Sequence, residues 1–125
     1  MDMKINLRYR GKILPVNDVK LVRGVKKAIG LMFKRQGKAQ ALLFSFKKPT
    51  KMAIHSLFVF FPFVAVWADV RGEVQEVKIV KPFTLTIIPK EPFYRLLEIP
   101  FNSEYKKIIQ ILVGTERFKY VSYLK

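Results

Sequence analysis

The sequence predicts a mainly β domain, α+β at most, built as a single compact β-barrel or β-sandwich with one short helix near residues 22–33. Three observations favour this class. Along most of the 125 residues, apolar side chains alternate with polar ones or run in short blocks bounded by Gly and Pro. Only residues 22–33 repeat apolar positions at clear helical spacing. Hydrophobic residues make up 50% of the chain, enough for a core in one domain of this length without disulfides.

The N-terminal part is expected to contain two strands and the helix. Residues 3–9 alternate apolar and polar side chains, which is the period of a half-buried strand, and Gly11 starts a turn after it. Residues 22–33 carry apolar side chains at intervals of three and four, and Gly24 and Gly30 weaken this helix and limit its length. Residues 42–46 are the next predicted strand.

The uncharged stretch at residues 52–68 has to be distinguished from a membrane span. It contains His55 and a central Pro62, and β-branched and aromatic residues dominate it. Two buried strands at 54–60 and 63–68, hinged at Pro62, therefore fit better than a transmembrane helix. The first residues lack a continuous apolar run, so no signal peptide is indicated and the protein is expected to be soluble and cytoplasmic.

A hairpin is predicted after this stretch. Residues 69–72, Asp-Val-Arg-Gly, form a turn in which Gly72 tolerates a positive φ, and residues 73–80 form the following strand. Residues 83–88 lie between prolines, which confine them to a sheet edge or a loop. If such an edge is uncovered it can pair with another molecule, so an assembly module is one hypothesis for function.

The C-terminal part is expected to close the sheet. Residues 96–99 and 118–124 have the composition of strands. Residues 103–108, between them, begin with Ser-Glu and predict one capped helical turn.

The basic residues are concentrated in the N-terminal part. The net charge is +15, and residues 20–51 contain ten basic side chains and no acidic one. Such a field attracts phosphates, anionic lipid headgroups or an acidic protein, although lysines can also serve solubility alone. Nucleic acid is the first expected partner. The candidate anion-binding residues are Lys26, Lys27, Lys34, Arg35, Lys38, Lys47 and Lys48.

Catalytic and metal-binding signatures are few. The chain has no cysteine and a single histidine, which excludes disulfides, thiol nucleophiles and the usual zinc sites. Its glycines form no phosphate-binding loop. Asp69, Glu73 and Glu76 carry oxygen ligands, but ordinary turn chemistry explains the first two. We therefore predict no metal and no cofactor, and we favour a binding domain over an enzyme.

Five short motifs occur in an order that resembles the uncharacterised family called domain of unknown function 192, found in archaea and bacteria. They are Gly-Leu-Met-Phe-Lys-Arg at 30–35, Ala-Leu-Leu-Phe-Ser-Phe at 41–46, Ile-His-Ser-Leu-Phe at 54–58, the hairpin at 69–73, and Leu-Glu-Ile-Pro at 97–100. The resemblance spans nearly the whole chain and implies a compact, mostly β domain with one short helix. It implies no chemistry, because none is assigned to the family.

A candidate pocket combines His55, Glu98 and Arg35. Glu98 stands between Leu97 and Ile99, so strand alternation turns its side chain to the opposite face from theirs, where a covered carboxylate needs a cation. Arg35 is that cation in this hypothesis, since it holds the basic position after the Gly-Leu-Met motif of the family that the chain resembles. His55 belongs to the Ile-His pair of the same resemblance. The alternatives are an exposed Glu98 and a structural His55 bonded to a backbone carbonyl.

Overall fold

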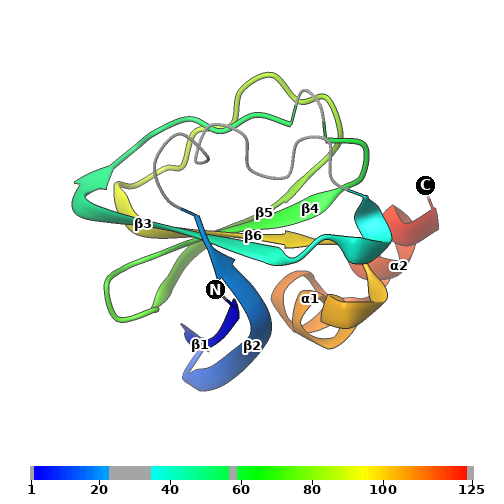
Figure 1. Cartoon of the computed structure of the whole chain (residues 1–125), viewed down its shortest axis with the longest axis horizontal. Coiled ribbons are helices and arrows are strands. Elements are labelled where there is room, and N and C mark those ends of the chain that lie inside the picture. Colours follow the sequence, from blue (N-terminus) through cyan, green and yellow to red (C-terminus); the bar gives the residue numbers. More distant parts are fainter. Residues whose placement is uncertain (1, 23–34, 57–58, 124–125) are drawn as a thin grey trace.

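The structure is a computed structural model and describes residues 2–22, 35–56 and 59–123. Its sheet has six strands in the order β1-β2-β3-β6-β4-β5 (Figure 1). Only β2 and β3 run parallel, and the other neighbours are antiparallel. The strands are β1 (Asp2–Tyr9), β2 (Lys12–Leu21), β3 (Ala41–Thr50), β4 (Phe63–Ala68), β5 (Val74–Val80) and β6 (Phe93–Pro100). The predicted mainly β class is confirmed.

Short helices flank the sheet. A 3-10 turn, η2 (Gln36–Lys38), precedes β3, and a second, η3 (Ser103–Tyr105), leads into α1 (Lys106–Val113) and α2 (Thr115–Tyr123). The helical turn predicted at 103–108 is confirmed and continues further than expected. The helix predicted near residues 22–33 lies outside the described residues, apart from Val22, which is buried.

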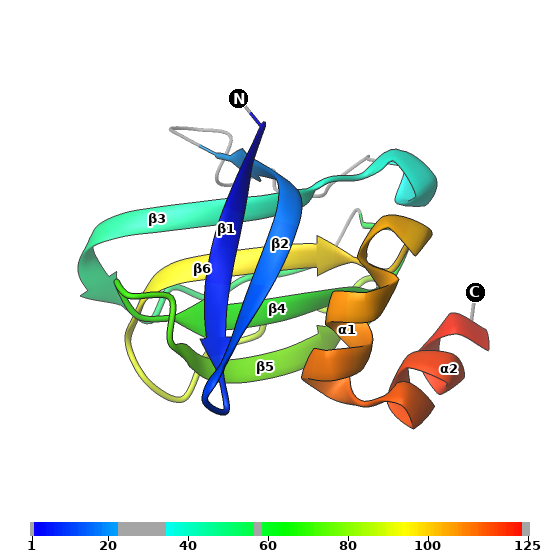
Figure 2. The ribbon, with the colours of Figure 1, turned by 90° about the horizontal axis from the view of Figure 1, so that it is seen from below.

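The six strands form a single sheet that curls into a half-barrel, so they do not form a sandwich of two sheets. Figure 2 shows the β1–β2 hairpin crossing the other strands. The two edges meet where the Arg8 amide donates to the Gly72 carbonyl over 2.8 Å. Gly72 has φ +84°, and a Cβ there would lie 2.8 Å from the Asn6 carbonyl oxygen. Glycine therefore permits both the turn and the close approach of the two edges.

Each face of the sheet has its own core. Leu97 and Ile99 belong to the core inside the curl, which β1, β2 and α1 cover. We call this the inner core. Phe63 and Trp67 belong to the outer core, on the other face, where Ile54 and Ile87 pack from the loops above the sheet (Figure 1). Strands buried on both faces read as continuous apolar runs, which explains the uncharged sequence of β4.

No element is predicted for residues 12–21, which form β2 and contain Pro15 and the Asn17-Asp18 pair, residues typical of turns. The structure accommodates both. β2 pairs with β3 only over Val19–Leu21, so Pro15 lies where that side of the strand has no partner. Asp18 takes φ +56°, and the β1–β2 register shifts near it.

The strand predicted at 54–60 is wrong for the residues that the structure describes there. Only Ile54 pairs, in an isolated bridge with Ile87. The neighbouring backbone groups bond to the segment that follows β5 instead of the sheet: the Ser56 amide donates to the Thr84 carbonyl over 2.8 Å. Residues 83–88 accordingly form a loop, one of the two settings predicted for them. The strand at 63–68 is confirmed as β4.

The strand predicted at 118–124 is also wrong, because residues 115–123 form α2. Phe118 and Val121, three residues apart, both pack against the inner core, and Phe118 stacks on Phe101 with ring centroids 5.6 Å apart. Helical spacing brings these two side chains to one face, whereas strand alternation would separate them. The strand prediction rests on the aromatic and β-branched composition of this segment, which does not exclude a helix.

Candidate functional site

The Glu98 carboxyl is buried within the outer core. Its partners across the sheet are Leu42 on β3 and Ala65 on β4, both members of that core. The residue is only 5% exposed. The predicted orientation, opposite to Leu97 and Ile99, is therefore confirmed by the register.

Burial controls the protonation of this carboxyl. Desolvation raises the pKa of Glu98 from 4.5 to about 8. No ion pair among the described residues involves Glu98; the pair present there joins Lys78 to Glu76. At neutral pH the side chain is mainly a neutral acid, which both donates and accepts hydrogen bonds.

Trp67 places a second polar group on the same face. It is the single tryptophan of the chain, and it is fully buried on β4. Because Glu98 pairs with Ala65 and Trp67 pairs with Leu96, the two residues are diagonal neighbours on adjacent strands. The indole Nε1 has no hydrogen-bond partner among the described residues. A buried donor without an acceptor is costly, which marks this place in the core as unusual.

Sequence reasoning singled out Glu98 and missed Trp67. Alternation alone places each residue on one face of its own strand. Whether the two faces coincide depends on which residues of β4 and β6 are opposite each other, and that register follows only from the assembled sheet. A lone tryptophan in an uncharged strand was the available signal.

His55 and Ser56 lie on the loop that covers this face. His55 is partly exposed, and Ser56 is fully buried. The Ser56 hydroxyl donates to the Lys81 carbonyl over 2.6 Å and accepts from the Thr84 amide over 2.7 Å. These bonds fasten one covering loop to the other, so the structure uses this hydroxyl to hold the loops together.

Arg35 is exposed immediately before η2. Its neighbour Gln36 donates through Nε2 to the Phe101 carbonyl, just past the end of β6. Arg35 thus lies near the end of the strand that carries Glu98. The ion pair predicted between Arg35 and Glu98 is not among the ion pairs of residues 2–22, 35–56 and 59–123.

Four of the seven predicted anion-binding residues are described by the structure, and these four form two separate pairs. Lys26, Lys27 and Lys34 lie outside the described residues. Arg35 and Lys38 are exposed at the start of β3, whereas Lys47 and Lys48 are exposed near its end. Six residues of extended chain separate Ala41 from Lys47, a length of about 20 Å. The described members therefore do not form one continuous patch by themselves.

The fold brings the start of α1, which carries Lys106 and Lys107, to the segment that carries Arg35 and Lys38. Asn102 donates through Nδ2 to the carbonyls of Gln36 and Ala39, over 2.8 and 3.0 Å. Its Oδ1 accepts from the Glu104 amide and caps η3. This side chain therefore ties η2 to the start of α1, where Lys106 and Lys107 are exposed.

A hollow of about 530 Å³ opens beside these lysines, between β2 and the start of α1. Its wall receives polar groups from Lys106, Lys107, Glu104, Asn17 and Ser103. Buried Leu14 and Ile108 supply apolar ones.

The acidic residues considered as metal ligands have other partners. The Asp69 carboxylate accepts from the amides of Arg71 and Glu73, over 2.8 and 3.0 Å, as the predicted turn requires. Glu76 is paired with Lys78. Within the described ranges, no three His, Cys, Asp or Glu side chains form a group suited to a metal ion. No helix in the same ranges is long and apolar enough to cross a membrane.

The fold and this site define a mainly β domain with a curled six-stranded sheet and a buried acid on its outer face. Residues 17–115 match the model of the family DUF192, described as "Uncharacterized ACR". The chain belongs to this family. No curated protein matches the chain.

Two solved structures share the fold. A "putative transcription regulator" from Sinorhizobium meliloti 1021 is 17% identical, with a TM-score of 0.69 over 86% of each chain. A protein of unknown function from Novosphingobium aromaticivorans DSM 12444 is 15% identical, also with a TM-score of 0.69, over 86% of this chain and 78% of that one. At these identities the likeness concerns the fold.

Proposed function

We propose that this protein is a non-enzymatic binding domain whose basic surface contacts an anionic partner, nucleic acid before acidic protein or lipid. The observation that carries the proposal is the imbalance of exposed charge. Several acids are engaged within the fold: Glu98 is buried, Asp69 holds a turn, and Glu76 pairs with Lys78. Most described lysines and arginines are exposed, so they are available to a polyanion.

The surface formed by η2 and the start of α1, at one end of the sheet, is the best-supported place for the contact. Arg35 and Lys38 come from one side of it, and Lys106 and Lys107 from the other. The three hydrogen bonds of Asn102 hold the two sides together, so these cations are positioned by the fold. The hollow beside Lys106 and Lys107 adds concave surface.

The partner would be recognised through its phosphates. Contacts of this kind position a protein on nucleic acid without reading bases, so sequence preference should be slight. The description of the Sinorhizobium meliloti protein as a putative transcription regulator agrees with such a role but supports it only through the fold.

Charge reversal in two separate sets of exposed cations tests the proposal. One variant carries Arg35→Glu, Lys38→Glu and Lys106→Glu; its matched control carries Lys47→Glu, Lys48→Glu and Lys51→Glu, with the same change in net charge. Affinity for duplex and single-stranded oligonucleotides is measured against salt. For four to six phosphate contacts, log K should fall against log salt with a slope of roughly −4 to −5. The first variant should flatten this slope, and the control should change it less.

Two results would reject the proposal. One is the absence of binding to either nucleic acid at about 50 mM salt, where such contacts are strong. The other is an equal loss of affinity in both variants, since total charge, and no defined surface, would then explain binding.

A second candidate function is a small-molecule binder or enzyme around His55, Glu98 and Arg35. The observation that favours it is the buried Glu98 acid beside the Trp67 indole. A ligand bound there should change the Trp67 fluorescence, and Glu98→Gln should weaken that response. A ligand whose affinity is unchanged in Glu98→Gln would place binding elsewhere.

A further inference from the structure

Exposed apolar side chains lie on the two loops that cover the outer core; the first loop is described at residues 51–56 and 59–62, and the second is residues 81–92. Leu85 is 72% exposed and Phe60 is 60% exposed, far more than a core-forming residue. The rings of Phe60 and Phe83 meet edge to face with centroids 5.5 Å apart, so the loops present these side chains together. We call this set the apolar loop surface. It consists of Phe60, Phe83, Leu85 and Ile88.

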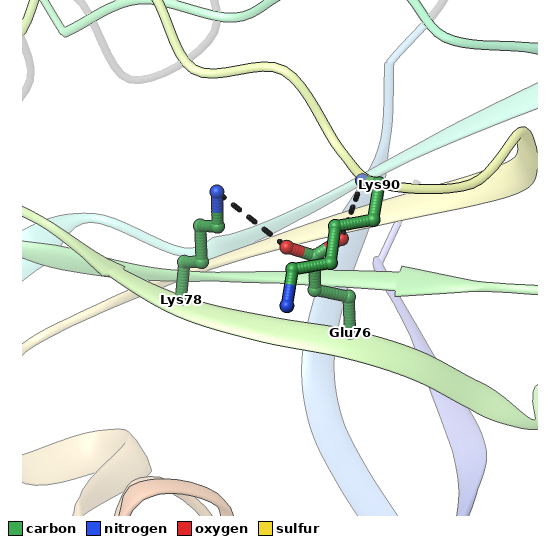
Figure 3. Close-up of polar contacts among 3 residues, drawn as sticks. All are labelled: Glu76, Lys78 and Lys90. Carbon is green, nitrogen blue, oxygen red and sulfur yellow. Dashed lines mark hydrogen bonds and ion pairs between the residues drawn. The ribbon is translucent and has the colours of Figure 1, made fainter.

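Hydrogen bonds fasten the second loop on both sides of these residues. Ser56 binds Lys81 and Thr84 at its start, and Ile54 and Ile87 exchange two backbone hydrogen bonds in its middle. At its end, the Glu76 carboxylate accepts from the Lys90 amide over 2.8 Å while pairing with Lys78 (Figure 3). The loop is therefore held in a conformation that directs apolar side chains into solvent.

Phe83 has a backbone conformation that is rare for a bulky side chain, with φ +61°. Its amide donates to the Ser56 carbonyl over 2.8 Å, which holds it there. Strained residues of this kind occur preferentially at sites that contact a ligand or partner.

Lysines flank the two loops along the chain. Lys51 begins the first loop, Lys81 precedes Phe83, and Lys90 follows Ile88; all three are exposed. The nearby acid Glu76 forms an ion pair with Lys78. Among the described residues of the second loop, the exposed acid is Glu91. Apolar side chains flanked by lysines match the boundary between lipid tails and anionic headgroups.

We propose that the apolar loop surface docks on an anionic lipid bilayer, with its four side chains inserted at the headgroup boundary and Lys51, Lys81 and Lys90 on the headgroups. A second copy of the chain is a poorer occupant, because it would bring its own flanking lysines up to these. The proposal goes beyond the nucleic-acid contact and uses other residues. Lys106 and Lys107 lie on α1, which packs against the opposite face of the sheet.

Sedimentation with lipid vesicles tests the proposal. The wild type should bind phosphatidylcholine vesicles that contain about 30% phosphatidylglycerol and should bind pure phosphatidylcholine weakly. Leu85→Ser with Ile88→Ser should lower the partition coefficient by about tenfold or more, the loss expected when two large apolar side chains no longer insert. The matched control is Ile13→Ser with Ile111→Ser, which removes exposed apolar side chains from β2 and α1 and should change binding little.

A fluorescent label reports insertion directly. Because the chain has no cysteine, Leu85→Cys gives a single attachment site for an environment-sensitive dye such as nitrobenzoxadiazole. On anionic vesicles the dye at position 85 should brighten and shift to the blue, whereas the same dye on Ile13→Cys should not.

Three outcomes would overturn the proposal. They are no sedimentation with anionic vesicles at low salt, equal binding of wild type and the Leu85→Ser, Ile88→Ser variant, and a self-association without lipid that this variant abolishes. The second would reduce membrane binding to charge alone, and the third would assign the surface to a second copy. The oligonucleotide measurements do not depend on either serine variant, so the two proposals fail separately.

Discussion

Glu98 and Trp67 are diagonal neighbours on one buried face of the sheet, Glu98 opposite Ala65 and Trp67 opposite Leu96. The Cα atoms of such neighbours are about 7 Å apart, close enough for a charge on Glu98 to change the surroundings of the Trp67 indole. A titratable acid beside the only tryptophan gives the outer core an internal optical probe.

The stability of the protein should fall as pH rises from about 5 to 8. The unfolded carboxyl loses its proton near 4.5, whereas the folded carboxyl keeps it to about 8. Between these values the folded chain binds one more proton, so the free energy of unfolding falls by roughly 1.4 kcal/mol per pH unit from this group. Below 4.5 the effect disappears, and above 8 it is complete.

Glu98→Gln should remove this dependence. The variant should be more stable than the wild type at pH 8.5 and similar to it at pH 4.5, since glutamine stays neutral at both. Urea denaturation at the two pH values measures the difference. A variant that loses stability equally at both would show that the acid makes a structural contact instead of carrying an ionisation penalty.

Trp67 emission should change with a midpoint near pH 8 in the native state, because a charge then appears beside the indole. The same titration of Glu98→Gln should be flat in that range. A transition that persists in the variant would assign it to a different group.

Gly72→Ala should destabilise the protein by about 2 to 4 kcal/mol. The new Cβ would lie 2.8 Å from the Asn6 carbonyl oxygen, in a backbone with φ +84°. Gly11→Ala is the matched control, since Gly11 has φ +78° but open space around it. Thermal unfolding should show a loss of about 1 kcal/mol for Gly11→Ala. Equal losses would mean that the close approach of the two sheet edges contributes nothing.

Asn102→Ala should cost roughly 2 to 4 kcal/mol, because it removes three hydrogen bonds from a buried position. It should also weaken nucleic-acid binding, since the cations of η2 and α1 lose their common support. Asn6→Ala, at an exposed position of β1, is the control for both measurements. Unchanged nucleic-acid affinity in a folded Asn102→Ala protein would separate the binding surface from this support.

The chain from residue 54 onward shows where prediction from the sequence works and where it fails. Residues 63–68 and 69–72 are correct because a strand of β-branched and aromatic residues and an Asp-x-x-Gly turn are local features. The segment 118–124 is wrong because its aromatic and β-branched composition does not exclude a helix, and only packing against Phe101 selects the helix. Residues 54–60 fail for a similar reason, since Ser56 finds its partners on a loop 25 residues away.

From the sequence alone come the mainly β class, the DUF192 resemblance, the excess of positive charge and the side of the strand to which Glu98 points. Each follows from local composition, order or alternation. The tertiary structure decides the burial of Glu98, its raised pKa and its neighbour Trp67. It also decides that Lys38 lies far from Lys47 and that Asn102 connects the segment carrying Lys38 to the segment carrying Lys106. They depend on strand register, on sheet curvature and on which loops cover which face, and these are set by contacts between residues far apart in the chain.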